Sequence, residues 1–157
     1  MPYNKEGRYQ RIHQQLQELF SSNNNILSRM ATINTLLYHK MEGFFWVGFY
    51  LLQDERLLVG PYQGPLACLE LARNKGVCWA AINSGKTMVV PDVHKFPGHI
   101  ACDSRSKSEI VILLKNFNHA ITGVLDIDSN LVDHFDEADA RHLEQIAALV
   151  YQEQDLL

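Results

Sequence analysis

Apolar residues recur every three to four positions through the first forty residues, which is the pattern of helices with one buried face. The first stripe consists of Tyr9, Ile12, Leu16, Leu19 and Phe20, and the second of Ile26, Met30, Ile33, Leu36 and Leu37. Three consecutive asparagines at 23–25 separate the stripes, and asparagine favours caps and turns over helix interiors. The pattern predicts two consecutive helices.

Beyond residue 43 the chain changes to short runs rich in aromatic and β-branched residues, which are typical of strands. Strands are expected over 44–52, 57–59, 66–71, 87–90, 110–114 and 120–127. The dipeptide Gly60-Pro61 is expected to end the second strand. Two further helices are expected, a short one over 76–82 and a closing one from about Asp136 to Gln152.

The order of these elements indicates an α+β fold. Because the strands come in adjacent runs, we expect a mostly antiparallel central sheet with the N- and C-terminal helices packed on it. The 157 residues contain no repeat or low-complexity tract, so residues 1–157 are expected to form a single domain. The apolar fraction of 46% and the charged fraction of 20% are typical of a soluble globular protein.

Charge and hydropathy argue against several classes of partner. The formal net charge is −4, and no run of lysine and arginine offers a phosphate-binding face, so nucleic acid is not an expected partner. No stretch of about 18 apolar residues predicts a membrane span. The N-terminus lacks the apolar core of a signal peptide, so we expect a cytoplasmic protein.

The segment from Pro91 to Ser108 is long and has no periodicity, which favours a functional loop. It carries Cys102, which we take as the candidate nucleophile. Arg105 and Lys107 lie close by in the sequence, and neighbouring cations stabilise a thiolate. Asp103 would act in the opposite direction if it lay alongside the sulfur.

The chain has two other cysteines, Cys68 and Cys78. Alternation along the expected strand places Cys68 on its less apolar face, which favours an orientation toward a site. Cys78 precedes Trp79 on an apolar helix, where a core thiol is the usual interpretation. Zinc would need a set such as Cys68, Cys78, His94, His99 and Cys102, but the spacing has neither C-x2-C nor H-x3-H, so no metal is expected.

Acidic residues occur where two of the expected strands begin or end. Glu109 opens one strand, whereas Asp126 and Asp128 end the next and point to the same face because they are two residues apart. Such residues form a solvated edge or a helix cap in many proteins. They equally suit a site that holds an ammonium group or donates a proton, and the spacing leaves both interpretations open.

Several segments together resemble the free methionine-R-sulfoxide reductases, a family built on a single GAF domain. The two longest are FPGHIACD at 96–103 and GVLDIDS at 123–129, and all three cysteines are in place. Shorter matches occur at 60–64, 76–78, 90–94 and 108–111. The resemblance extends from about Trp46 to the closing helix, and the paired N-terminal helices also fit.

The resemblance implies a GAF-type fold and a role for each candidate residue. Cys102 corresponds to the catalytic cysteine, Cys68 to the resolving cysteine and Cys78 to a third cysteine that joins disulfide exchange. Trp46 corresponds to the aromatic wall that packs the substrate methyl group. The acidic residues of the substrate pocket correspond to Glu109, Asp126 and Asp128. A Cys68–Cys102 disulfide is expected in the oxidised protein.

The activity implied by the resemblance is thiol-dependent reduction of free L-methionine-(R)-S-oxide to methionine, which connects the protein with oxidative stress. The family needs no cofactor and is regenerated by thioredoxin. GAF domains also pair as homodimers through their terminal helices. The alternative is a non-catalytic GAF-type sensor of a small molecule or of redox state, and turnover of the free sulfoxide distinguishes the two.

Overall fold

The computed structural model describes residues 3–99 and 102–153. The helices in these ranges are α1 (Lys5–Phe20), α2 (Ile26–Lys40), α3 (Gly76–Ser84), the 3-10 turn η1 (Val93–Lys95) and α4 (Glu137–Ala148). The strands are β1 (Trp46–Gln53), β2 (Arg56–Gln63), β3 (Glu70–Leu71), β4 (Met88–Val90), β5 (Ser108–Lys115) and β6 (Ile121–Ser129). None of the described helices is long and apolar enough to cross a membrane.

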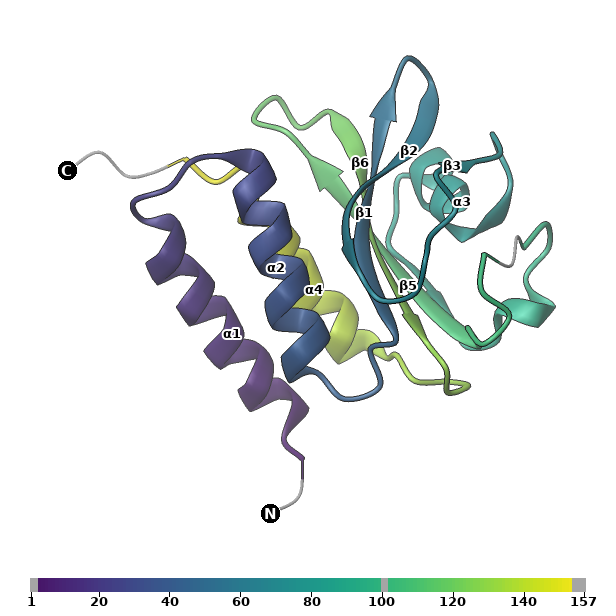
Figure 1. Ribbon diagram of the computed structural model, residues 1–157, viewed down its shortest axis with the longest axis horizontal. Helices are drawn as coiled ribbons and strands as arrows, with labels where there is room; N and C mark the ends of the chain where they lie inside the picture. Colours follow the sequence, from purple (N-terminus) through teal and green to yellow (C-terminus); the bar gives the residue numbers. More distant parts are fainter. Residues whose placement is uncertain (1–2, 100–101, 154–157) are drawn as a thin grey trace.

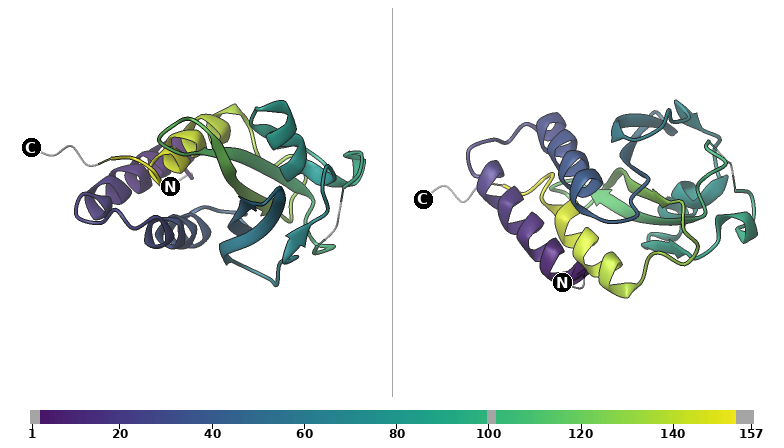
Figure 2. Two further views of the ribbon diagram at one scale, coloured as in Figure 1. Left: turned by 90° about the horizontal axis from the view of Figure 1, so that it is seen from above. Right: turned by 60° about the horizontal axis from the view of Figure 1, so that its bottom comes forward.

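The six strands form one sheet in the order β3-β2-β1-β6-β5-β4, and every neighbouring pair is antiparallel. Helices α1, α2 and α4 lie together on one side of this sheet, whereas α3 and the loops around η1 lie on the other (Figures 1 and 2). The expected α+β fold, with a mostly antiparallel sheet and packed terminal helices, is confirmed.

Side-chain caps explain where three of the helices begin. The side chains of Asn4 and Asn25 accept hydrogen bonds from the backbone of the first turns of α1 and α2, at 3.0 and 2.9 Å. Asp136 opens α4 with a capping box completed by Asp139. Such caps satisfy backbone N–H groups that a helix leaves without partners at its start.

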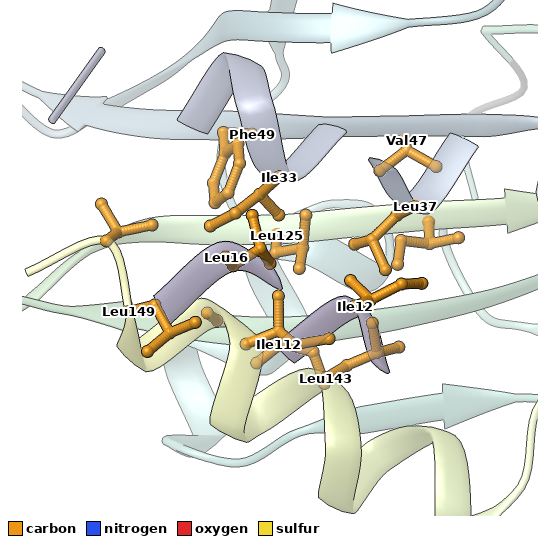
Figure 3. Close-up of a cluster of buried hydrophobic side chains, with 14 of the residues drawn as sticks. Ile12, Leu16, Ile33, Leu37, Val47, Phe49, Ile112, Leu125, Leu143 and Leu149 are labelled. Carbon is orange, nitrogen blue, oxygen red and sulfur yellow. The ribbon is translucent and has the colours of Figure 1, made fainter. Parts of the chain in front are cut away.

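Alternation along the central strands gives the sheet two different faces. The odd-numbered positions of β1 and β6 and the even-numbered positions of β5 turn toward the helices, and Val47, Phe49, Ile112 and Leu125 are buried there (Figure 3). Residues of α1, α2 and α4 complete this main core. The alternate positions turn toward α3, where Trp46, Tyr50, Val111 and Val124 form a second buried cluster.

Two details of the sheet differ from the sequence-based expectation. Strand β2 does not end at Gly60-Pro61 but continues to Gln63. In its pairing with β1, Gly48 lies opposite Tyr62 and Tyr50 opposite Val59, so Gly60 and Pro61 together face one residue. This is a β-bulge, and a bulge is one of the few places where a sheet accepts proline.

The expected strand over 66–71 is shortened to Glu70–Leu71, so the prediction that Cys68 follows strand alternation is wrong. Leu66 and Leu69 are 86% and 75% exposed, and the segment runs as a loop at the edge of the sheet. Its position comes from tertiary contacts that periodicity does not encode. The closing helix is also shorter than expected and ends at Ala148.

A buried arginine connects the helices at one end of the molecule. Arg29 is 2% exposed and donates hydrogen bonds to the backbone carbonyls of Phe20, Asn23, Leu149 and Gln152 at 2.7–3.2 Å. Phe20 is the last residue of α1, and the other carbonyls lie just beyond the ends of α1 and α4. The guanidinium group therefore satisfies helix-end acceptors from two elements at once.

We expect Arg29→Ala to lower the free energy of unfolding by roughly 2–4 kcal/mol, because it leaves several buried carbonyls without donors. Urea denaturation followed by circular dichroism measures this change. Arg11→Ala, at an exposed position of α1, is the matched control and should change stability by less than about 0.5 kcal/mol. Equal effects of the two substitutions would contradict the structural role of Arg29.

Candidate active site

A cleft opens on the face of the sheet that the terminal helices leave uncovered. Its floor is formed by β1, β5 and β6. Its sides are formed by the start of α3 and by the loops that carry Cys68 and Cys102. Six of the seven site residues expected from the sequence line the cleft, namely Trp46, Cys78, Cys102, Glu109, Asp126 and Asp128. The seventh, Cys68, is held at the site by its disulfide with Cys102. The structure thus brings together residues that are far apart in the chain.

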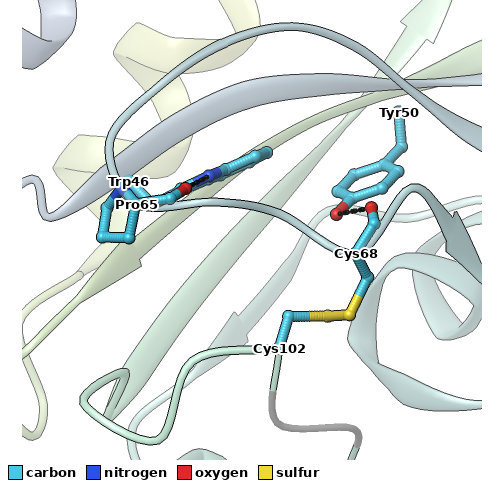
Figure 4. Close-up of a disulfide and its surroundings, with 5 residues drawn as sticks. All are labelled: Trp46, Tyr50, Pro65, Cys68 and Cys102. Atoms are coloured by element: carbon cyan, nitrogen blue, oxygen red, sulfur yellow. Dashed lines mark hydrogen bonds between the residues drawn. A yellow bond between two sulfur atoms is a disulfide. The ribbon is translucent and has the colours of Figure 1, made fainter.

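Cys68 and Cys102 form a disulfide at the mouth of the cleft, with their Cα atoms 5.5 Å apart (Figure 4). The structure therefore contains the pairing expected for the oxidised protein. The segment carrying Cys68 is anchored by two side chains of β1: Trp46 donates to the Pro65 carbonyl at 3.1 Å and Tyr50 to the Cys68 carbonyl at 3.0 Å. Cys102 is exposed, whereas Cys68 is half-buried.

An aromatic wall stands beside the disulfide. The Trp46 ring stacks on Tyr50 and on Tyr62, with ring centroids 5.7 and 5.3 Å apart. Gly48 makes this possible, because a Cβ atom there would lie 2.5 Å from the Trp46 ring and 2.4 Å from the Tyr62 side chain. The missing side chain leaves space for the indole against the strand.

Three carboxyl groups lie on the floor of the cleft. Glu109 pairs with Asp128 across β5 and β6, and Asp126 lies opposite Val111 in the same ladder. Glu109 and Asp126 are only 6% and 5% exposed, and Asp128 is half-buried. Within residues 3–99 and 102–153, no lysine, arginine or histidine forms an ion pair with any of them.

Burial without a cation changes the acidity of these groups. Desolvation raises the pKa of Glu109 well above its usual value, and the charges of Asp126 and Asp128 raise it further. Burial also raises the pKa of Asp126 to about 7, against the lowering effect of hydrogen bonding with Glu109 and Cys78. Burial likewise raises the pKa of Asp128 well above its usual value. The cleft thus contains carboxylic acids that can donate protons near neutral pH.

Cys78 lies next to this group on α3 and is a buried thiol, 3% exposed, as expected for an apolar helix position. Burial raises the pKa of the Cys78 thiol, and the charges of Asp126 and Glu109 add to the shift. A protonated buried thiol reacts slowly as a nucleophile. Cys78 is therefore chemically different from the two cysteines at the mouth.

The charged residues near Cys102 are engaged with one another. Arg105 donates hydrogen bonds to both carboxylate oxygens of Asp103, at 3.0 and 2.7 Å. These hydrogen bonds lower the pKa of Asp103 to about 2. The Arg105 guanidinium also lies 4.8 Å from the Phe45 ring centre. Burial and the neighbouring His94 lower the pKa of His99. Ile100 and Ala101 of the FPGHIACD segment lie outside the described residues.

A GAF domain model matches residues 5–153. The chain is 39% identical over 145 residues to the free methionine-R-sulfoxide reductase of Escherichia coli, an alignment that covers 92% of this chain and 87% of that protein. It is 46% identical over 148 residues to GAF domain-containing protein A of Dictyostelium discoideum, with 93% and 92% covered. The X-ray structure of free methionine-R-sulfoxide reductase from Neisseria meningitidis in complex with its substrate superposes with a TM-score of 0.89 at 37% identity, over 96% of this chain and 90% of that one. The chain belongs to the free methionine-R-sulfoxide reductase family of GAF-domain proteins.

Two aromatic residues that stack on Trp46 in this GAF domain, Tyr50 and Tyr62, were not among those expected from the sequence. Tyr50 lies four positions after Trp46 on the same strand, so alternation alone could have placed both in the cleft. Tyr62 reaches the wall through the bulged pairing of β1 and β2, which no short motif encodes. The five-residue zinc set is not available in this form of the GAF domain, because Cys68 and Cys102 are bonded to each other.

The contribution of Asp126 to the stability of this GAF domain should fall as the pH rises from about 4 to about 7. The ordinary pKa of Asp126 is 3.8 and its pKa in the folded protein is about 7. Between these two pH values the folded state keeps the proton on Asp126, whereas the unfolded chain releases it. The stabilisation contributed by Asp126 is therefore complete below about pH 4 and is lost as the pH rises through about 7.

Asp126→Asn keeps the neutral shape of the protonated acid, so we expect its Tm to exceed that of the natural protein at pH 8 by at least about 2 °C. At pH 4.5 the difference should shrink, because Asp126 is then protonated anyway. Calorimetry at the two pH values measures the effect, with exposed Asp133→Asn as the matched control. A pH-independent difference would contradict the assignment of a buried, protonated Asp126.

Proposed function

We propose that this protein reduces free methionine-R-sulfoxide to methionine, with Cys102 as nucleophile. One observation carries the proposal. Three carboxyl groups that form no ion pair with other described residues share a cleft with an aromatic wall and with a cysteine pair that forms a disulfide. The free methionine-R-sulfoxide reductases of Escherichia coli and Neisseria meningitidis, to which the chain is similar, support the same activity.

The cleft offers one surface for each part of the substrate. The ammonium group of the substrate is the cationic partner for the three carboxyl groups, Glu109, Asp126 and Asp128, which form no ion pair with other described residues. The methyl group and the side-chain carbons pack on the Trp46 indole, which the stacked Tyr50 and Tyr62 hold in place. Because a peptide-bonded residue has no ammonium group, this arrangement favours the free amino acid over methionine sulfoxide in proteins.

The reaction begins with both cysteines at the mouth reduced. The Cys102 thiolate attacks the sulfoxide sulfur while a protonated carboxyl, Glu109 or Asp128, gives its proton to the oxygen. The protonated oxygen then transfers to the Cys102 sulfur: the S–O bond of the substrate and the new bond between the two sulfur atoms both break, methionine leaves, and Cys102 becomes a sulfenic acid. The Cys68 thiol then attacks the Cys102 sulfur, the sulfenic hydroxyl leaves as water, and the disulfide forms. In total, one sulfoxide and two thiols give methionine, one disulfide and water.

A dithiol protein of the thioredoxin class is the reductant we assign to the Cys68–Cys102 disulfide, with exposed Cys102 as the accessible sulfur. A cytoplasmic location is part of the same proposal, because dithiol reductants act in a reducing compartment. A role under oxidative stress is part of it as well, because the substrate is an oxidation product of methionine. The proposal also includes a homodimer in which two copies pair through their terminal helices.

The experiment that tests this function follows methionine formation from free methionine-R-sulfoxide with thioredoxin or dithiothreitol as reductant. We expect turnover of the R-epimer, no measurable turnover of the S-epimer, and little activity on an N-acetylated sulfoxide amide. Cys102→Ser should reduce the rate by more than about tenfold, because a covalent nucleophile normally accounts for most of it.

Circular dichroism of Cys102→Ser ensures that the loss is chemical and not a failure to fold. Absence of turnover by the folded, reduced natural protein would instead favour the non-catalytic sensor of a small molecule or of redox state. Comparable rates on the free sulfoxide and the N-acetylated amide would contradict the role of the carboxyl groups.

The two remaining cysteines should behave differently when replaced. We expect Cys68→Ser to complete one turnover and then stall, with Cys102 held as sulfenic acid or in a slow bridge to Cys78. Cys78→Ser should keep most of its multiple-turnover activity, because Cys78 is a buried, protonated thiol. Rapid-quench measurement of methionine per enzyme, followed by peptide mapping, gives both results. A dominant Cys78–Cys102 peptide in the natural protein would reverse the two roles.

A further inference from the structure

We propose that the floor of the cleft contains a binding site for a thiophilic divalent cation of the Zn²⁺ class, formed by Cys78, Glu109 and Asp126. The site is distinct from the set of cysteines and histidines that the sequence offered for zinc, with which it shares only Cys78. The binding itself goes beyond the proposed reductase activity and does not depend on it.

The geometry of three ligand atoms supports the site. The Cys78 sulfur and one carboxylate oxygen from each of Glu109 and Asp126 all lie within 4.8 Å of one another. Sulfur and oxygen ligands on a tetrahedral zinc ion are about 3.6 Å apart, as follows from bond lengths of about 2.3 and 2.1 Å. Side-chain movements of about 1 Å therefore close the set around an ion.

Three separate elements hold these ligands in place. Cys78 lies in the first turns of α3, Glu109 in β5 and Asp126 in β6. The two strands are paired in register through this region, with Glu109 opposite Asp128 and Val111 opposite Asp126. A site supported by a sheet and a packed helix loses little freedom on binding, which favours affinity.

A second observation, on the hydrogen bonding of Asp126, supports a ligand at the same place. The Oδ1 atom of Asp126 is buried and has no hydrogen-bond partner among the described residues, and Asp126 as a whole is 5% exposed. Buried polar atoms are nearly always paired, so each exception needs an explanation. Asp126 also lines the cleft, so an ion that enters from solvent reaches it.

The chemistry of the donor set selects the kind of cation. A thiolate with two carboxylates suits Zn²⁺, Co²⁺ and Cd²⁺, whereas Mg²⁺ and Ca²⁺ prefer oxygen ligands alone. The ion takes the place of the protons that Cys78 and the carboxyl groups carry, and these protons leave to solvent. The fourth coordination position faces the cleft. If the proposed function holds, the ion competes with the substrate ammonium group.

The protein in its disulfide form allows a clear test, because Cys78 is then its free thiol. Binding of Zn²⁺ is measured by calorimetry, and Co²⁺ serves as the spectroscopic probe through its thiolate charge-transfer band in the near ultraviolet. We expect one ion per chain with a Kd of about 10 μM or tighter. Mg²⁺ at millimolar concentration should not displace it.

Variants separate the site from general charge attraction. Cys78→Ser should abolish the charge-transfer band and weaken Zn²⁺ binding at least about 30-fold, because it removes the thiolate ligand. Glu109→Gln should weaken binding while keeping the band at higher Co²⁺ concentration. Asp103→Asn removes a charge from the same cleft outside the ligand set and should change the Kd less than about threefold. Thermal unfolding confirms that each variant is folded.

The proposal is overturned if the oxidised natural protein shows no saturable binding, or if Cys78→Ser retains the charge-transfer band. If Cys78→Ser does not fold, the same decision rests on Glu109→Gln against Asp103→Asn. Turnover measured separately in metal-free buffer keeps this result apart from the proposed function, since loss of either property leaves the other measurable.

Discussion

The pairing of β5 with β6 is the constraint on which both the core and the cleft depend. Ile112 and Leu125 lie opposite each other and are buried against the helices, whereas their neighbours along the strands turn to the other face. A shift of one residue in this register would turn every side chain to the opposite face. The hydrophobic residues that bury the helical face therefore also fix the carboxyl groups in the cleft, and neither set can move without the other.

That coupling carries an energetic cost. Glu109 and Asp126 are almost completely buried, without an ion-pair partner in the described chain, and desolvation favours their protonated forms. The same floor includes the unpaired Oδ1 atom of Asp126. Proteins accept such local costs at sites that bind ligands and offset them elsewhere. Here the offset is the large apolar core on the opposite face of the sheet, together with the buried Arg29 at the helix ends.

Much of this arrangement could be predicted from the chain, because it follows from local periodicity. The stripes of the N-terminal helices, the shared face of Asp126 and Asp128 and the irregular loop around Cys102 are all visible in the sequence. The conformation of the segment carrying Cys68 was not predictable, since hydrogen bonds from Trp46 and Tyr50 hold it. Neither was the proximity of Cys78 to the carboxyl groups, because it depends on how α3 packs on the sheet. Local signals specify elements, whereas contacts between distant segments need the assembled fold.

The disulfide has a mechanical consequence as well as a chemical one. It joins two loops that face each other across the mouth of the cleft and are separated by 34 positions in the chain. A cross-link of this span removes many of the conformations that the two loops could otherwise adopt. The oxidised protein thus has a cross-linked entrance, and reduction removes that constraint. Each change in the oxidation state of two sulfur atoms is thereby converted into a change in the rigidity of the entrance.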